Sequence, residues 1–216
     1  MKLIAEDISK VIAGRTILDH VNLEMESGRI YGFAGRNGSG KTMLFRALSG
    51  LMSLSSGRVL LDDKVLRRDF AVLPSLGIVL ENAGMYPGMT GEENLRYLAS
   101  LKHIAGKEDI RKTLERVGLD PDDTRKYRKY SMGMKQRLAI AQAVMEKPDV
   151  LMLDEPFNGL DESGVKEIRE LIRMEKGRGA LILLASHNRE DMEILADELY
   201  HVEGGRISRK EDESDE

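Results

Sequence analysis

The feature that most constrains the fold of this chain is a glycine-rich segment, residues 35–42, which ends in a lysine and a threonine. Its sequence is Gly35-Arg36-Asn37-Gly38-Ser39-Gly40-Lys41-Thr42. A short apolar run, residues 30–34, precedes it, and a segment that favours a helix, residues 41–51, follows. Such an apolar run is typical of a strand buried on both faces. A strand, a glycine-rich turn and a helix in this order predict a loop that binds phosphate groups.

The residue types in this segment suit an anion. The glycines allow the backbone to curl, so that successive N–H groups point at phosphate oxygens. The helix that begins near Lys41 directs the positive end of its dipole at the same anion. Lys41 would add a charge beside the β- and γ-phosphates, and the Thr42 hydroxyl would be a ligand of Mg²⁺. The alternative, a glycine-rich turn with a surface lysine, is disfavoured by the strand and helix on either side.

A second candidate site lies at the end of another apolar run. Residues 150–153 are followed by Asp154 and Glu155. Because the carboxyl ends of parallel strands share one edge of a sheet, this pair is expected beside the phosphate loop. Asp154 is then a candidate for the Mg²⁺ shell, and Glu155 for a general base that polarises water. The alternative is two acids in a surface loop.

Strands and helices are expected to alternate along most of the chain. The expected strands cover residues 3–8, 21–25, 30–34, 57–61, 76–80, 150–153 and 180–185. Between residues 90 and 145 the pattern is helical, with Leu95, Leu98 and Leu101, then Ile110, Leu114 and Val117, at helical spacing. We therefore predict an α/β fold: a P-loop NTPase core with a mostly parallel sheet, an N-terminal antiparallel β region and an inserted α-helical subdomain.

The domain is expected to cover residues 1–208, with the helical subdomain at about 87–147. Residues 209–216 hold two bases and five acids and are expected to be a disordered tail. The formal net charge of −4 disfavours a nucleic-acid partner, which calls for a basic surface.

Composition excludes several other classes. The chain has no cysteine, which removes disulfides, thiolate metal sites and cysteine nucleophiles. The longest uncharged runs, such as 70–80, reach eleven residues, and a membrane-spanning helix needs about 20. Residues 1–7 carry early acids, so a secretory signal is not expected.

Further motifs, in a fixed order around Asp154 and Glu155, make the likeness to one family specific. They are Tyr130-Ser131-Met132-Gly133-Met134-Lys135-Gln136-Arg137, Asn158-Gly159-Leu160-Asp161, Ala185-Ser186-His187 and Glu203-Gly204-Gly205-Arg206-Ile207. With the phosphate loop they resemble, over about residues 2–207, the nucleotide-binding subunit of ATP-binding-cassette (ABC) transporters. In the family these motifs are the signature, the D-loop, the switch histidine and a closing hairpin.

The resemblance implies a function for each motif. Two subunits, a homodimer or a heterodimer, would hold ATP and Mg²⁺ between them, with Ser131 and Gly133 reaching the γ-phosphate in the partner's site and Asp161 close to nucleotide. His187 would contact the γ-phosphate and the attacking water. The reaction would convert ATP and water into ADP and phosphate and would drive a separate transmembrane permease at the cytoplasmic face of the membrane. The alternatives are that Ser131 merely caps a helix and that His187 is an ordinary polar group at a strand end.

The sequence departs from the family pattern at two candidate residues. The family stacks an aromatic ring on adenine shortly after the first strand, and that position here is Ile12. The family also has a glutamine that touches Mg²⁺ and contacts the membrane partner, and here that residue is Glu81. A carboxylate is a suitable ligand of Mg²⁺, although Glu81 could equally be a solvated loop acid. The surroundings of Glu81 and the signature are similar to those of the subgroup that exports bacitracin and lantibiotic peptides.

Two other functions stay open at this stage. An ABC ATPase of translation or DNA repair would usually carry tandem cassettes or a coiled-coil insertion, which this chain lacks. A binding or regulatory module without hydrolysis would be compatible with Ile12 and with the methionines of the signature. We expect an exporter ATPase, whose cargo is not encoded in this chain.

Overall fold

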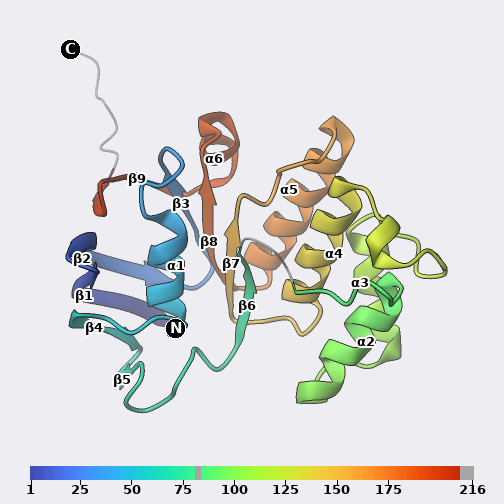
Figure 1. Ribbon diagram of the computed structural model, residues 1–216, viewed down its shortest axis with the longest axis horizontal. Coiled ribbons are helices and arrows are strands. Elements are labelled where there is room, and N and C mark those ends of the chain that lie inside the picture. Colours follow the sequence, from blue (N-terminus) through green and yellow to red (C-terminus); the bar gives the residue numbers. More distant parts are fainter. Residues whose placement is uncertain (81–83, 210–216) are drawn as a thin grey trace.

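The computed structural model describes residues 1–80 and 84–209, which form two β-sheets and a set of helices (Figure 1). The first sheet has four strands in the order β2-β1-β4-β5. Their bounds are β1 (Lys2–Ile12), β2 (Arg15–Glu26), β4 (Ser56–Leu61) and β5 (Lys64–Val65). All three strand pairs are antiparallel. The expected N-terminal antiparallel region is therefore confirmed, with a first strand that runs beyond residues 3–8.

The second sheet has six strands in the order β10-β9-β3-β8-β7-β6. Their bounds are β3 (Ile30–Ala34), β6 (Leu76–Val79), β7 (Val150–Asp154), β8 (Leu181–Ser186), β9 (Glu198–Glu203) and β10 (Arg206–Arg209). Every pair is parallel except β9 with β10. This arrangement confirms the mostly parallel sheet, and it brings the carboxyl ends of β3, β6, β7 and β8 to one edge.

The helices lie around this second sheet. They are α1 (Lys41–Ser49), α2 (Gly91–Lys102), α3 (Lys107–Arg116), α4 (Met132–Val144), α5 (Glu162–Gly177) and α6 (Arg189–Leu195), with a 3₁₀ turn at Tyr127–Lys129. In Figure 1, α1 lies between the two sheets, whereas α2 and α3 stand at the far side of α4. No helix within residues 1–80 and 84–209 combines the length and the apolar character needed to cross a bilayer.

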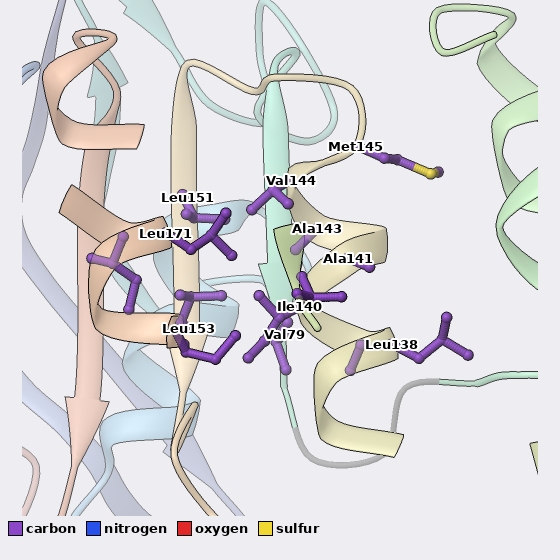
Figure 2. Close-up of a cluster of buried hydrophobic side chains, with 14 of the residues drawn as sticks. Val79, Leu138, Ile140, Ala141, Ala143, Val144, Met145, Leu151, Leu153 and Leu171 are labelled. Carbon is purple, nitrogen blue, oxygen red and sulfur yellow. The ribbon is translucent and has the colours of Figure 1, made fainter. Parts of the chain in front are cut away.

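The central strands are buried on both faces, because their side chains alternate between two apolar clusters. Val150 and Met152 of β7 belong to a cluster that includes Phe45 of α1 and the antiparallel sheet. Leu151 and Leu153 of the same strand belong to a cluster on the other face, with α4 and α5. Figure 2 shows this second cluster between β6, β7 and α4. The continuous apolar runs in the sequence follow from this burial on both faces.

A glycine sets the distance between β6 and α4. A Cβ atom built on Gly77 would collide with the backbone carbonyl oxygen of Ala143 and would lie 2.8 Å from Pro148 Cγ. Because glycine has no side chain, α4 can lie directly against the sheet at this position. The first turn of α4 is thereby held beside the edge where the strands end.

Candidate functional site

A cleft of about 850 Å³ opens at the edge where the parallel strands end. It is lined by residues 37–42 of the glycine-rich loop, by Asp154 and Glu155 after β7, and by His187 after β8. The first turns of α4 contribute Met132, Lys135 and Gln136. The structure therefore brings the loop together with the acidic pair and the histidine, both of which follow the loop by more than a hundred residues in sequence.

Lys41 is held over the glycine-rich loop. Its ammonium group donates to the carbonyl oxygens of Gly35 at 2.7 Å and Arg36 at 3.2 Å. The side chain is 6% exposed and lies 4.0 Å from a Glu155 carboxylate oxygen. Gly40 ends the loop with φ 115°, in the region that favours glycine, and α1 begins without a side-chain cap. The open helix end and the buried ammonium form an electropositive site suited to phosphate.

Thr42 and Asp154 meet at the base of the cleft. The Thr42 hydroxyl donates to the Asp154 carboxylate, which is 7% exposed. A hydroxyl and a carboxylate are the hard oxygen donors that Mg²⁺ prefers, and the ion usually completes its shell with water and substrate phosphates. Within residues 1–80 and 84–209 no group of three or more acidic, histidine or cysteine side chains could hold a metal ion. The donor set thus fits an ion that is shared with a phosphate ligand.

The Glu155 carboxylate is bound by the end of β8. It accepts from the His187 backbone N–H at 2.9 Å and the Ser186 hydroxyl at 3.2 Å, and it lies 2.9 Å from His187 Nδ1. Glu155 itself has φ 50°, and its N–H donates to the Ala185 carbonyl at 2.8 Å. This backbone geometry turns the chain out of β7, so that the side chain faces His187 instead of continuing the strand.

The signature and D-loop residues begin helices in this chain. Ser131 caps α4 by accepting from the Met134 N–H at 3.2 Å, and Asp161 caps α5 by accepting from the Gly164 N–H at 2.9 Å. The Gly164 N–H lowers the pKa of Asp161 below its ordinary value. A Cβ on Gly133 would lie 2.8 Å from the Gly159 carbonyl oxygen, so the two motifs are in close contact. None of Ser131, Gly133 and Asp161 lines the cleft, so their role in a partner's site stays a prediction.

Of the two residues at which the sequence departs from the family pattern, the structure describes Ile12. Ile12 ends β1, is 43% exposed and does not line the cleft. Its role in adenine binding stays a prediction. Glu81 lies outside the described residues, as do residues 210–216 of the expected tail. Arg209, by contrast, pairs with Tyr200 as the last residue of β10.

Several residues that line the cleft were not candidates from the sequence. Among them are Thr16 and Ile17 of β2, and also Tyr127 and Gln136. Burial raises the pKa of Tyr127, which keeps its phenol neutral. These residues belong to none of the motif positions with an assigned role, and only the folded chain brings them to the loop. Ser186 could have been found, because it directly precedes the histidine at the end of an expected strand.

Comparison with known proteins identifies the family. The sequence model described as ABC transporter matches residues 18–158. The chain belongs to the ABC transporter ATP-binding family. It is 42% identical over 205 residues to the uncharacterised ABC transporter ATP-binding protein YybJ of Bacillus subtilis (strain 168), across 95% of this chain and 94% of that protein.

Relatives with named transport roles are also similar to this ABC subunit. The bacitracin transport ATP-binding protein BcrA of Bacillus licheniformis is 38% identical, across 93% of this chain and 66% of that protein. The lantibiotic transport ATP-binding protein SrtF of Streptococcus pyogenes is 35% identical, across 94% and 87% respectively. These matches confirm the resemblance to the bacitracin and lantibiotic subgroup.

A solved structure shares the fold. It is the dimeric structure of a post-hydrolysis state of an ATP-binding cassette bound to ADP and phosphate, with a TM-score of 0.86 and 20% sequence identity, across 97% of each chain. This likeness shows the fold. Membership of the ABC transporter ATP-binding family, shown by the sequence comparisons, makes the chain an ATP-binding subunit and an ATPase of that family.

Proposed function

We propose that this ABC subunit hydrolyses ATP at the edge of its parallel sheet, as half of a dimer that drives an exporting permease. The observation that carries the proposal is the grouping of four side chains in one cleft: Lys41, the Thr42–Asp154 pair and Glu155. An ammonium suited to phosphate, an oxygen donor pair suited to Mg²⁺ and a carboxylate suited to a general base are the parts that phosphoryl transfer to water requires.

Each residue of the site would have a separate role. The loop amides of 35–42 and Lys41 bind the phosphates. Thr42 and Asp154, with Glu81, would hold Mg²⁺, which neutralises charge on the phosphates when it is bound. Glu155 accepts a proton from the attacking water, and His187, whose ring already contacts that carboxylate, orients the base and senses the γ-phosphate.

The dimer would complete each site. Ser131 and Gly133 at the start of α4 present backbone N–H groups to the γ-phosphate held by the partner, and Asp161 lies beside them at the start of α5. The similar cassette bound to ADP and phosphate is itself dimeric, which supports this assembly. ATP then joins the two subunits, and hydrolysis lets them separate.

The coupled partner would be a transmembrane permease, with this subunit bound at the cytoplasmic face of the membrane. The bacitracin and lantibiotic transport roles of the relatives support export of a peptide-like compound. Adenine would be held by apolar contact from Ile12, without ring stacking.

Replacement of the proposed base tests the reaction. We expect Glu155→Gln to lower steady ATP turnover at least about 100-fold, since general base catalysis contributes about 10²–10⁴-fold. ATP binding persists in this variant, because the amide keeps the shape of the side chain, and ATP shifts the protein towards a dimer in size-exclusion chromatography. Glu170→Gln is the control, because Glu170 is an exposed residue of α5 that forms an ion pair with its neighbour Arg173 on the helix surface. Turnover in Glu155→Gln equal to that of the control would refute the assignment.

A further inference from the structure

Helix α4 contacts the loop that carries Glu155 within the same subunit. Gln136 donates from Nε2 to the Glu155 backbone carbonyl oxygen at 3.1 Å. One turn earlier, Gly133 packs against the Gly159 carbonyl so closely that a Cβ would lie 2.8 Å from the oxygen. Residues three apart share one face of a helix. The first two turns of α4 therefore hold both ends of the segment 155–159.

Glu155 requires such support because of its backbone. A left-handed φ costs an L-residue about 1–2 kcal/mol, and such a conformation persists only where the surroundings hold it. The Glu155 N–H donates to Ala185 at 2.8 Å, and its carbonyl accepts from the Asn158 N–H at 3.3 Å. Gln136 adds a third hydrogen bond, which comes from a side chain of a different element.

We propose that Gln136 is a positioning residue, which sets the direction of the Glu155 carboxylate through the carbonyl of the same residue. The proposal rests on the function proposed above, in which Glu155 is the base. It adds a route of regulation. Ser131 and Gln136 lie on the same rigid start of α4, so a movement of α4 when Ser131 meets the partner's nucleotide also moves Glu155. The state of one site in the dimer is thereby transmitted to the base of the other.

Three variants test this role. Gln136→Met removes the N–H donor and keeps the length of the side chain, whereas Gln136→Lys restores a donor at similar reach. Gln142→Met is the matched control, since Gln142 is a partly buried glutamine of the same helix that lies outside the cleft. We expect Gln136→Met to lower kcat for ATP about tenfold, on the scale of one lost hydrogen bond, with KM changed less than about twofold. Gln136→Lys recovers most of kcat, and Gln142→Met resembles the wild type.

A purely structural bond would give a different pattern. Because the Asn158 N–H still binds the Glu155 carbonyl, loss of Gln136 leaves no orphaned acceptor, and we expect Tm to fall by only a few degrees. Wild-type kcat in Gln136→Met, or equal loss in the methionine and lysine variants, would overturn the positioning role. The proposed function would survive either result as long as Glu155→Gln still abolishes turnover. Absence of turnover in the wild type would instead overturn both.

Discussion

At the scale of single residues, Lys41 shows how the site is prepared for phosphate. Its ammonium is almost fully buried, and its partners are two loop carbonyls instead of a carboxylate in direct contact. A buried charge with neutral partners is only partly compensated. An anion that enters the cleft therefore meets an ammonium group that was already desolvated when the chain folded, so binding does not have to remove that water.

Truncation of Lys41 follows from this geometry. We expect Lys41→Ala to weaken ATP binding at least about tenfold, because hydrogen bonds to charged groups contribute about 1.5–3 kcal/mol. Titration with a fluorescent ATP analogue measures the change. Lys166→Ala, at an exposed position of α5, serves as the control. Equal affinities in the two variants would contradict the role of Lys41.

The candidate site was predictable where its residues end a strand or begin a helix. The rule for parallel strands predicted that the acidic pair after 150–153 lies beside the phosphate loop. The family resemblance assigned His187 to the γ-phosphate, and the structure puts Glu155 and His187 in contact. Gln136 was not predictable, because its hydrogen bond depends on how closely α4 packs against the sheet. That distance is set by Gly77 and Ala143, which no local pattern connects.

At the scale of elements, the start of α2 depends on a capping box. The Thr90 N–H donates to the Glu93 carboxylate at 2.7 Å, and the Glu93 N–H donates to the Thr90 hydroxyl at 3.2 Å. Lys126 donates to the same carboxylate at 3.0 Å. The Thr90 N–H and then Lys126 lower the pKa of Glu93 below its ordinary value. These contacts favour the ionised form and stabilise the helix start.

This cap predicts a pH-dependent contribution to stability. Because the pKa is lower in the folded state, the contribution is complete above the pKa of the unfolded chain, about 4.3. It is lost as the pH falls through the lower folded value. We expect Glu93→Gln to lower Tm at pH 7 and to match the wild type more closely near pH 3, as measured by circular dichroism.

A variant of the neighbouring glutamate, Glu92, serves as the control that distinguishes loss of the cap from loss of a negative charge. Glu92 lies in the same first turn and pairs with Arg96 at 3.9 Å. Glu92→Gln should lower Tm at pH 7 by less than Glu93→Gln, because it removes no capping bond. A Tm difference between Glu93→Gln and wild type that stays constant from pH 7 to pH 3 would contradict the mechanism.

Helices and strands were predicted unevenly, for physical reasons. Leu95, Ile110 and Leu114 are buried, as their helical spacing indicates, but Leu101 follows the same spacing and is 67% exposed. The difference arises because Leu101 lies on a different face of α2 from Leu95 and Ala99, which are both buried. The strand expected at residues 3–8 extends to Ile12, since pairing with β2 continues through Lys10, Val11 and Ile12, where polar and apolar residues do not alternate.

At the scale of the whole molecule, the helical part is joined to the core by a buried carboxylate. Glu175 of α5 is 2% exposed and accepts from Arg116 of α3 at 2.6 Å and from Arg178 at 3.0 Å. Arg178 also donates to the Pro148 carbonyl, which precedes β7. One acid thus connects the inserted helices, α5 and the entry to a central strand.

Neutralisation of this acid is expected to destabilise the fold. Glu175→Gln should lower the free energy of unfolding by about 2 kcal/mol, since two charge-assisted hydrogen bonds weaken while both guanidinium groups stay partly exposed. Urea denaturation measures the change. The control Glu170→Gln removes a surface pair and should cost less than about 0.5 kcal/mol. Equal losses of unfolding free energy in the two variants would show that Glu175 does not hold the inserted helices to the core.

The alternation of side chains along β7 determines which face of the sheet Asp154 occupies at the end of the strand. Val150, Met152 and Asp154 share one parity and therefore one face, which is the face that carries α1 and Thr42. A single residue inserted into or deleted from this strand would exchange its two apolar layers and would turn Asp154 away from Thr42. Two requirements therefore constrain the length of β7. Its apolar side chains must pack in the correct layers, and Asp154 must reach Thr42 in the cleft.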